Sequence, residues 1–157
     1  TKRNIKIYDS GAIFRQEAER VIQQVNPALI IFDQIDKIRG FDADRNDLVM
    51  GAIYEWARDL AKAYAPVIGI CQSDGTGEGV KWLTMSHVAD AKTAKQAEAD
   101  WILGIGRTHV EDLQSVRHFY ISKNKLTGDS DSNPEWRHAK WDVLFHPQIA
   151  RYQDLGE

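Results

Sequence analysis

The chain has 157 residues, of which 43% are hydrophobic and 27% are charged, and its formal net charge is −3 at pH 7. This length allows one sizeable hydrophobic core and leaves little room for a second, so we predict a single domain over residues 1–157. No apolar run approaches the roughly 20 residues of a membrane span, so no membrane partner is expected. The slightly negative charge excludes a strongly basic nucleic-acid binder, so any DNA contact must come from local loops.

The cysteine and histidine residues give no sign of a disulfide or a structural metal. Cys71 is the single cysteine, which excludes an internal disulfide. The five histidines are scattered without the spacing of metal ligands. The N-terminus has no charged and then apolar signal segment, so we expect a cytoplasmic protein.

The first part of the sequence predicts a strand, a helix and a second strand. Residues 4–8 alternate polar and apolar side chains before a turn, which is typical of a short strand. Apolar residues recur at helical spacing over residues 14–25, and an Asn-Pro pair then ends the predicted helix. The apolar run 28–32 predicts a central parallel strand that is buried on both faces, with Asp33 at its carboxyl end.

A long helix and another buried strand are predicted next. Residues 47–64 carry an apolar stripe, and Asp47 is the expected N-cap of this helix. The apolar run 67–71 predicts a second parallel strand, which is followed by Gln72. Because the carboxyl ends of parallel strands meet at one edge of a sheet, Asp33 and Gln72 are expected to converge.

The remaining sequence predicts a loop, a further β-α unit and an antiparallel extension. Residues 73–79 are rich in glycine and lack the Gly-x-x-x-x-Gly-Lys-Ser/Thr order of a phosphate loop, so we interpret them as a mobile loop. A short helix over residues 91–97 and a strand over 101–105 complete a β-α-β-α-β alternation, which is typical of a parallel α/β sheet. Further strands, with alternating side chains and turn residues between them, are expected over residues 116–122, 141–145 and 149–152.

Four polar residues at strand ends are candidates for chemistry. Nucleotide-hydrolysing motors use an aspartate at the end of a buried strand to hold Mg²⁺, and Asp33 fits this position; the alternative is an aspartate that only caps a turn. Gln72 could sense a γ-phosphate, or it could be an ordinary polar surface residue. Lys123 and Lys125 lie two residues apart at a strand end and should point to the same side, where they suit a phosphate or simply protect a solvated edge strand.

The tryptophan residues are not assigned to DNA binding. Indole rings can stack on bases, but isolated tryptophans more often serve packing. This interpretation covers Trp82, Trp101, Trp136 and Trp141.

Four segments, taken in order, resemble successive motifs of the DnaB-type replicative DNA helicases and phage primase-helicases. They are residues 28–33 (ALIIFD), 67–72 (VIGICQ), 97–103 (AEADWIL) and 121–129 (ISKNKLTGD). The resemblance covers nearly the whole chain. It implies a RecA-like P-loop NTPase core, an α/β fold with a parallel sheet flanked by helices, together with a C-terminal antiparallel β extension. The N-terminal part with the phosphate loop would be missing.

The resemblance implies roles for the strand-end residues and for the glycine-rich segment. Asp33 resembles the Walker B aspartate, which binds Mg²⁺ and belongs to the catalytic centre, and Gln72 resembles the sensor residue. The segment after Gln72 resembles the loop that lines the ring's central channel and follows single-stranded DNA. Its expected DNA-binding residues are Gly75, Gly77, Gly79 and Lys81.

The resemblance also implies a cationic element that acts on the neighbouring subunit. Lys123 and Lys125 occupy the places of a lysine and an arginine that reach the ATP bound next door and stabilise transition-state charge. The family more usually has arginine where this chain has Lys125, and a lysine cannot make the bidentate fork of a guanidinium. The turn with Thr127 and Gly128 matches the family and is expected to contribute to nucleotide binding.

The implied parent protein is an ATP-dependent DNA helicase that forms a hexameric ring. It would use ATP or another NTP with Mg²⁺, move on single-stranded DNA in the cytoplasm of a bacterium or phage-infected host, and have primase and polymerase as further partners. Because no phosphate loop precedes Asn4, we expect a fragment of a longer polypeptide that is inactive alone. The alternatives are another RecA-like ATPase, such as a recombinase or clock-type regulatory ATPase, and a non-catalytic assembly or DNA-binding module.

Overall fold

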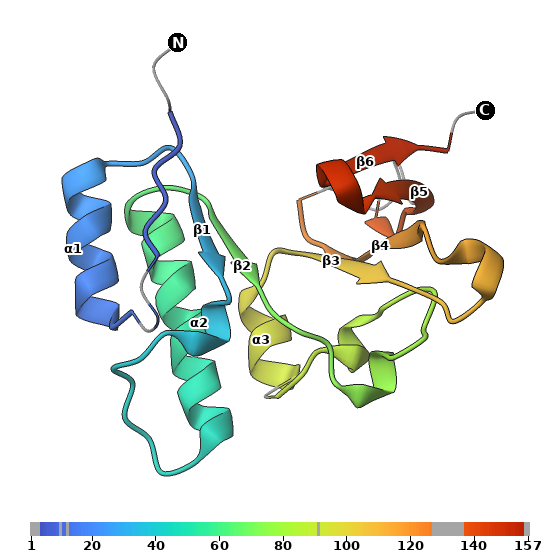
Figure 1. The fold of residues 1–157 in the computed structure, drawn as a ribbon. Coiled ribbons are helices and arrows are strands. Elements are labelled where there is room, and N and C mark those ends of the chain that lie inside the picture. The colour runs from blue at the N-terminus through green and yellow to red at the C-terminus, as the bar shows by residue number, and fades with distance from the viewer. Residues whose placement is uncertain (1–3, 10, 12, 91, 127–136, 156–157) are drawn as a thin grey trace. The chain divides into compact units, whose positions relative to one another are not determined.

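The computed structural model describes residues 4–9, 11, 13–90, 92–126 and 137–155 (Figure 1). The chain divides into two compact units, Thr1–Ile70 and Cys71–Glu157, and each is described by itself. The single domain expected from the chain length stays a prediction. Within the described ranges, no helix combines the length and the apolar character needed to cross a membrane.

The first unit combines two helices with a two-stranded parallel sheet (Figure 1). The helices are α1 (Arg15–Val25) and α2 (Asn46–Ala63), and the strands are β1 (Ile30–Asp33) and β2 (Val67–Ile70). A short 3₁₀ turn, Ile35–Lys37, follows β1. The two strands pair in register from Ile30 with Val67 to Asp33 with Ile70. The parallel pairing places the carboxyl ends of both strands at one edge of this small sheet.

Apolar side chains from the helices and from β1 form the core of the first unit. The sequence predicts α1 from its apolar stripe, and the structure confirms it: Ala18 and Ile22 on this stripe are buried, and Asn26 ends the helix in a left-handed conformation. On α2, Ile53 has no exposed surface, and Trp56 contacts the ring of Phe32 on β1. The contact between Trp56 and Phe32 attaches α2 to the sheet. Burial of each large apolar side chain in this core contributes roughly 1.5–3 kcal/mol.

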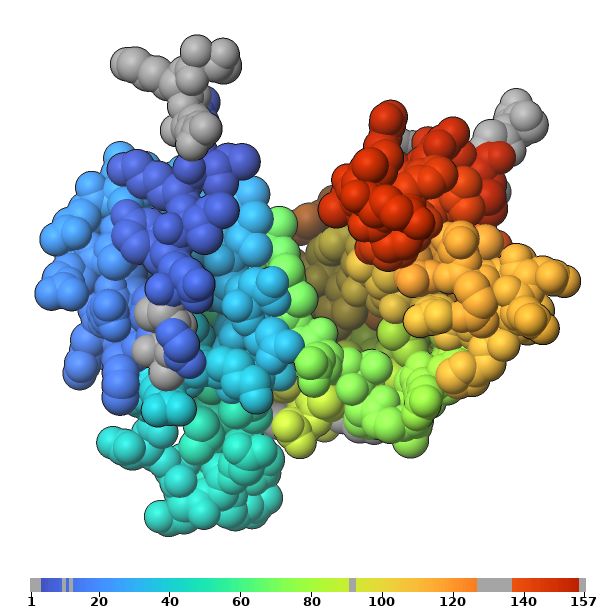
Figure 2. All heavy atoms as spheres, viewed as in Figure 1, coloured from blue at the N-terminus to red at the C-terminus, as the bar shows by residue number. Residues whose placement is uncertain are grey.

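Three expectations for the first unit are wrong. Residues 4–8 form no strand, and Figure 2 shows this dark blue segment on the surface of the unit, where Ile7 is 86% exposed. Neither strand is buried on both faces: Ile31 on β1 is 57% exposed and Ile68 on β2 is 48% exposed. Successive side chains of a strand point to opposite faces, so a strand that is covered on one face leaves alternate side chains exposed. Arg45, not Asp47, occupies the N-cap of α2, and Asp47 pairs with Arg45 at 2.6 Å from the first turn.

The second unit is built on a four-stranded antiparallel sheet in the order β3-β4-β5-β6. The strands are β3 (Trp101–Gly106), β4 (Val116–Asn124), β5 (Lys140–His146) and β6 (Arg151–Asp154), and the short helix α3 (Lys92–Glu98) precedes them. Short 3₁₀ turns occur at Gly75–Gly77, Met85–His87, Glu111–Leu113 and Pro147–Ile149. The antiparallel extension expected from the alternating sequence is therefore confirmed.

The prediction of a third parallel strand is wrong. The sequence places a strand near residues 101–105, and β3 is there, but it pairs antiparallel with β4 and not with β1 or β2. A short connection, residues 107–115, joins β3 to β4, whereas a parallel pair needs a crossover of about a dozen or more residues. The described chain is thus an α/β protein with a small parallel sheet and a larger antiparallel one.

Candidate functional site

Asp33 lies at the carboxyl end of β1, where the sequence predicts it. Its carboxylate is exposed, and among the described residues it has no hydrogen-bond or ion-pair partner. The nearby Asp36 differs, since it accepts a hydrogen bond of 2.9 Å from the hydroxyl of Tyr54. The peptide bond between Asp33 and Gln34 is cis. An exposed carboxylate at the end of a parallel strand can serve as one oxygen ligand of a magnesium ion that keeps most of its waters.

Gln72 follows β2 by two residues and belongs to the second unit. Its side chain is exposed, and its backbone carbonyl oxygen accepts a hydrogen bond of 3.3 Å from the Ala89 amide. Asp33 belongs to the first unit, so the expected convergence of its side chain with Gln72 stays a prediction.

The glycine-rich segment has more local order than the sequence predicts. Residues 75–77 form one turn of 3₁₀ helix, and the Asp74 carboxylate caps it by accepting a hydrogen bond of 2.9 Å from the Thr76 amide. A backbone hydrogen bond joins the two ends of the segment 74–87, since the Asp74 amide donates to the His87 carbonyl at 2.8 Å. Residues 74–87 therefore form a closed loop that contains a short 3₁₀ turn, and its mobility stays a prediction.

A hollow of about 380 Å³ opens beside this loop. Gly77 and Gly79 line it together with Arg107 and His109, which follow β3. Gly79 has a φ of +70°, and a Cβ atom there would come 2.5 Å from the His109 ring, so the site requires glycine. Two of the predicted DNA-binding glycines thus line one hollow with a guanidinium and an imidazole.

Lys81 lies just beyond the hollow and joins a chain of polar contacts. Its ammonium nitrogen is 3.3 Å from Oδ2 of Asp142 on β5, and the other carboxylate oxygen is 2.7 Å from Nδ1 of His118 on β4. His118 is 1% exposed, and its Nε2 atom has no hydrogen-bond partner among the described residues. A surface lysine is therefore connected through one carboxylate to a buried imidazole.

The electrostatics of Asp142 follow from these two partners. Burial works to raise the pKa of Asp142, but the hydrogen bonds from His118 and Lys81, with their charges, outweigh it and hold the pKa below its ordinary value of 3.8. The carboxylate is therefore charged at neutral pH and is able to keep Lys81 in place.

Lys123 and Lys125 point to the same side, as their spacing predicts, but they reach into their own unit. The ammonium of Lys123 donates to the Gln96 carbonyl, and that of Lys125 donates to the Ala97 carbonyl at 3.2 Å. Lys125 also lies 3.9 Å from Asp100. Both cations thus satisfy carbonyls at the C-terminal end of α3, where positive charge is favourable. Thr127 and Gly128, the other predicted nucleotide-binding residues, lie outside the described residues.

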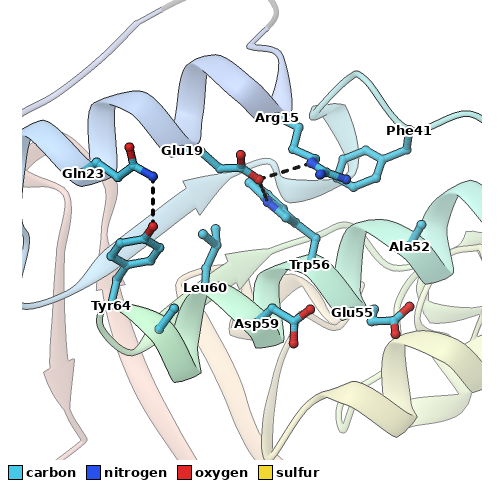
Figure 3. Close-up of a pocket in the computed structure, with 11 residues that line it drawn as sticks. Arg15, Glu19, Gln23, Phe41, Ala52, Glu55, Trp56, Asp59, Leu60 and Tyr64 are labelled. Atoms are coloured by element: carbon cyan, nitrogen blue, oxygen red, sulfur yellow. Dashed lines mark hydrogen bonds and ion pairs between the residues drawn. The ribbon is translucent and has the colours of Figure 1, made fainter.

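The first unit has a hollow of its own between α1 and α2, with a volume of about 400 Å³ (Figure 3). Glu19 on α1 accepts a hydrogen bond of 2.7 Å from Trp56 Nε1, which links α1 to α2, and one of 3.2 Å from Arg15 Nε on its own helix. The Tyr64 hydroxyl accepts a further bond of 3.0 Å from Gln23. No residue that the sequence singles out for chemistry lines this hollow.

No known family model matches the chain, and no curated protein matches it.

Sequence reasoning missed the residues that the second unit brings together around Lys81. His118 and Asp142 pair directly across β4 and β5, and Arg107 and His109 line the hollow. The alternation of β4 does place His118 on the same face as the buried Val116, which is the available signal for a buried histidine. Nothing in the local sequence indicates that Asp142 is its partner. Among the described residues, no group of three or more histidine, cysteine or acidic side chains could hold a metal ion by itself.

Proposed function

We propose that this chain is part of the motor domain of a DnaB-type replicative DNA helicase with a RecA-like core. The parent forms a hexameric ring, hydrolyses ATP or another NTP at the subunit interfaces and unwinds duplex DNA by moving along single-stranded DNA. The observation that carries the proposal is the exposed carboxylate of Asp33 at the carboxyl end of a parallel strand, which no residue in the described part of the chain pairs with. Ligands of open α/β sheets bind at this edge.

Asp33 is the residue that would hold Mg²⁺. Magnesium commonly takes one or two protein carboxylates together with water and substrate phosphates, so an exposed carboxylate at a strand end fits this ion. When bound, the ion neutralises negative charge on the phosphate groups. The sequence contains no phosphate loop, so nucleotide binding is proposed for the longer polypeptide and not for these residues alone.

Lys123 and Lys125 are proposed to act on the nucleotide of the neighbouring subunit, with Thr127 and Gly128 in the turn that follows. In this role their ammonium groups exchange the carbonyls of Gln96 and Ala97 for phosphate oxygens. The exchange is favourable in charge, because a phosphate oxygen carries more negative charge than a carbonyl. Gln72 is proposed to sense the γ-phosphate.

The DNA-binding part of the proposal rests on the closed loop of residues 74–87. Gly75 has no atom near the position of a Cβ, and Lys81 is exposed, so this loop offers open backbone and a positive charge to a phosphodiester chain. Gly77 and Gly79 form the wall of the adjacent hollow. These residues would contact single-stranded DNA in the centre of the ring, while primase and polymerase are proposed as further partners.

One observation favours a second candidate function, a non-catalytic module for assembly or DNA binding. Lys123 and Lys125 are both engaged with α3, which is a structural role that needs no nucleotide. Another RecA-like ATPase is the third candidate, and it shares Asp33 and the parallel strands.

The test is an Asp33→Asn substitution in the full-length protein, with DNA-stimulated hydrolysis of Mg-ATP as the measurement. The helicase proposal expects a loss of roughly 100-fold or more, because an amide cannot replace the charge that holds the ion. Asp59→Asn, at an exposed aspartate on α2, is the matched control and should keep full activity. Unchanged hydrolysis in the Asp33 variant would refute the mechanism, and absence of hydrolysis from the unaltered protein would favour the non-catalytic module.

A further inference from the structure

Two lysines and two aromatic rings gather at one place on the second unit. The Lys81 ammonium lies 4.8 Å from the centroid of the Trp82 ring. The Lys140 ammonium lies 5.7 Å from the same ring and 5.0 Å from the ring of Tyr120, which faces Lys140 directly across β4 and β5. We call these four residues, Lys81, Trp82, Tyr120 and Lys140, the Trp82 cluster.

Buried groups hold the Trp82 cluster in position. The ring of His118, itself 1% exposed, packs edge to face against Trp82 with a centroid separation of 5.4 Å. Through Asp142, the same histidine is connected to Lys81. The lysine and the indole are therefore anchored from below by one buried side chain, which lowers the entropy lost when a ligand binds.

The backbone that carries Trp82 also packs closely against β3. The segment of residues 80–83 packs directly on β3, and a Cβ atom on Gly106 would overlap the carbonyl oxygens of Val80 and Lys81. Gly104 allows the same approach under Leu83. The position of Trp82 thus depends on two glycines of the neighbouring strand, and it is not a freely moving loop side chain.

The charge of the Trp82 cluster is positive and in part uncompensated. Asp142 pairs with Lys81, but within the described part of the chain the ammonium of Lys140 contacts only the two rings. Lys140 is exposed, and His138 adds a further ring near Tyr120 at a centroid distance of 6.3 Å. An exposed cation between aromatic rings matches a ligand that combines an anion with a flat ring.

We infer that the Trp82 cluster is a binding site for one nucleotide step of a single-stranded nucleic acid. The ammonium groups of Lys81 and Lys140 contact the phosphate, and the ring of Trp82 or Tyr120 stacks on the base. Base-aromatic stacking next to a positive charge is the common way in which proteins bind single strands without reading their sequence. This inference rests on the proposed function, which also has single-stranded DNA as the ligand. It extends the DNA contacts from the glycine-rich loop to residues of β4 and β5.

The test measures binding of a fluorescein-labelled oligothymidylate to the full-length protein by fluorescence anisotropy over a range of salt concentrations. Lys140→Gln should weaken binding several-fold and reduce the slope of log Kd against log salt by about 0.7 for the lost phosphate contact. Trp82→Leu should weaken binding about tenfold, whereas Trp82→Phe, which keeps a ring, should retain most of the affinity. Lys62→Gln, at an exposed lysine on α2, is the charge-matched control and should leave both Kd and the salt slope unchanged.

The Lys140→Gln variant changes only a surface side chain, so it tests the site even where Trp82→Leu affects folding. If Lys140→Gln binds with the unaltered Kd and salt slope, the inference is overturned. The same measurements with an oligouridylate distinguish DNA from RNA as the ligand. A loss of affinity for either oligonucleotide supports the site and shows which nucleic acid it binds.

The result is separable from that of the helicase proposal. If Asp33→Asn abolishes hydrolysis while the Trp82 variants bind normally, only the present inference fails. If hydrolysis is unaffected by Asp33→Asn while the Trp82 variants lose binding, the nucleic-acid site stands and the helicase mechanism fails.

Discussion

His118 and Asp142 face each other directly across β4 and β5, and Nδ1 of the buried imidazole lies 2.7 Å from the carboxylate. The opposite oxygen of Asp142 reaches Lys81 at the surface. One carboxylate thus links the interior of the second unit to its proposed nucleic-acid surface. This pair has consequences for stability, for pH dependence and for the position of the loop of residues 74–87.

Asp142→Asn should destabilise the protein by about 1–3 kcal/mol at pH 7, because the amide pairs less strongly with His118 and Lys81. Burial works to raise the pKa of Asp142, but the two partners lower it below 3.8 in the folded state. A carboxyl group with a depressed pKa stabilises the fold fully above its unfolded-state pKa, and this contribution is lost as the pH falls through the folded-state value. Urea unfolding of both proteins between pH 7 and about pH 2 checks this.

The difference in unfolding free energy between the unaltered protein and Asp142→Asn should therefore be constant above about pH 5 and shrink below about pH 4. A difference that persists unchanged to the lowest pH would show that the ion pair does not cause it.

Gly106→Ala should loosen the loop from the sheet, because a Cβ there meets the backbone oxygens of Val80 and Lys81 and neither can move cheaply. We expect a cost of about 1–3 kcal/mol in unfolding free energy. Gly75→Ala is the matched control, since nothing lies within 4 Å of its added Cβ. Thermal unfolding of the two variants measures the effect, and equal transition temperatures would contradict the close packing of residues 80–83 on β3.

Lys123→Met keeps the apolar stem of the side chain and removes the ammonium that binds the Gln96 carbonyl. The end of α3 should lose about 1 kcal/mol of local stability, because one of its terminal carbonyls loses a charged donor. Hydrogen exchange at the Ala99 amide, which bonds the Lys95 carbonyl, should become about fivefold faster. Unchanged exchange at Ala99 would mean that Lys123 does not stabilise the end of α3.

Ile53→Ala tests the core of the first unit. Ile53 has no exposed surface, so its truncation should cost about 2–5 kcal/mol through lost burial and the cavity that remains. Leu48→Ala is the control on the same helix, because Leu48 is 53% exposed and should change stability by less than about 0.5 kcal/mol. Denaturant unfolding with equal midpoints for the two variants would contradict the assignment of the core.

Local patterns predicted the helices and strands of this chain well, because their periodicity reflects which face is buried. The stripe on α1 and the long stripe on α2 gave helices within two residues of those observed. The end of α1 was predictable from the Asn-Pro pair, and Asn26 does adopt the left-handed conformation that ends it. Residues 4–8 have the pattern of a strand, but they have no strand to pair with in the described structure.

Within the candidate sites, the sequence predicted where the polar residues lie along their strands but not which groups they bind. Asp33 lies at the strand end as expected, and Lys123 and Lys125 point to one side, yet the carbonyls of α3 that bind them could not be foreseen. The sequence favours a packing role for Trp82, and its ring does pack on His118, but the ammonium groups of Lys81 and Lys140 also lie close to the ring.

Local sequence patterns were enough to predict most helices and strands, the strand-end position of Asp33 and the alternating character of the last strands, because each of these depends on neighbours within a few residues. The three-dimensional structure was needed to show that β3 pairs antiparallel with β4, that Asp142 bonds a histidine 24 residues away and that Lys140 reaches Trp82. Strand pairing and register bring together residues that are distant in the chain. No local periodicity encodes which strand will be the partner.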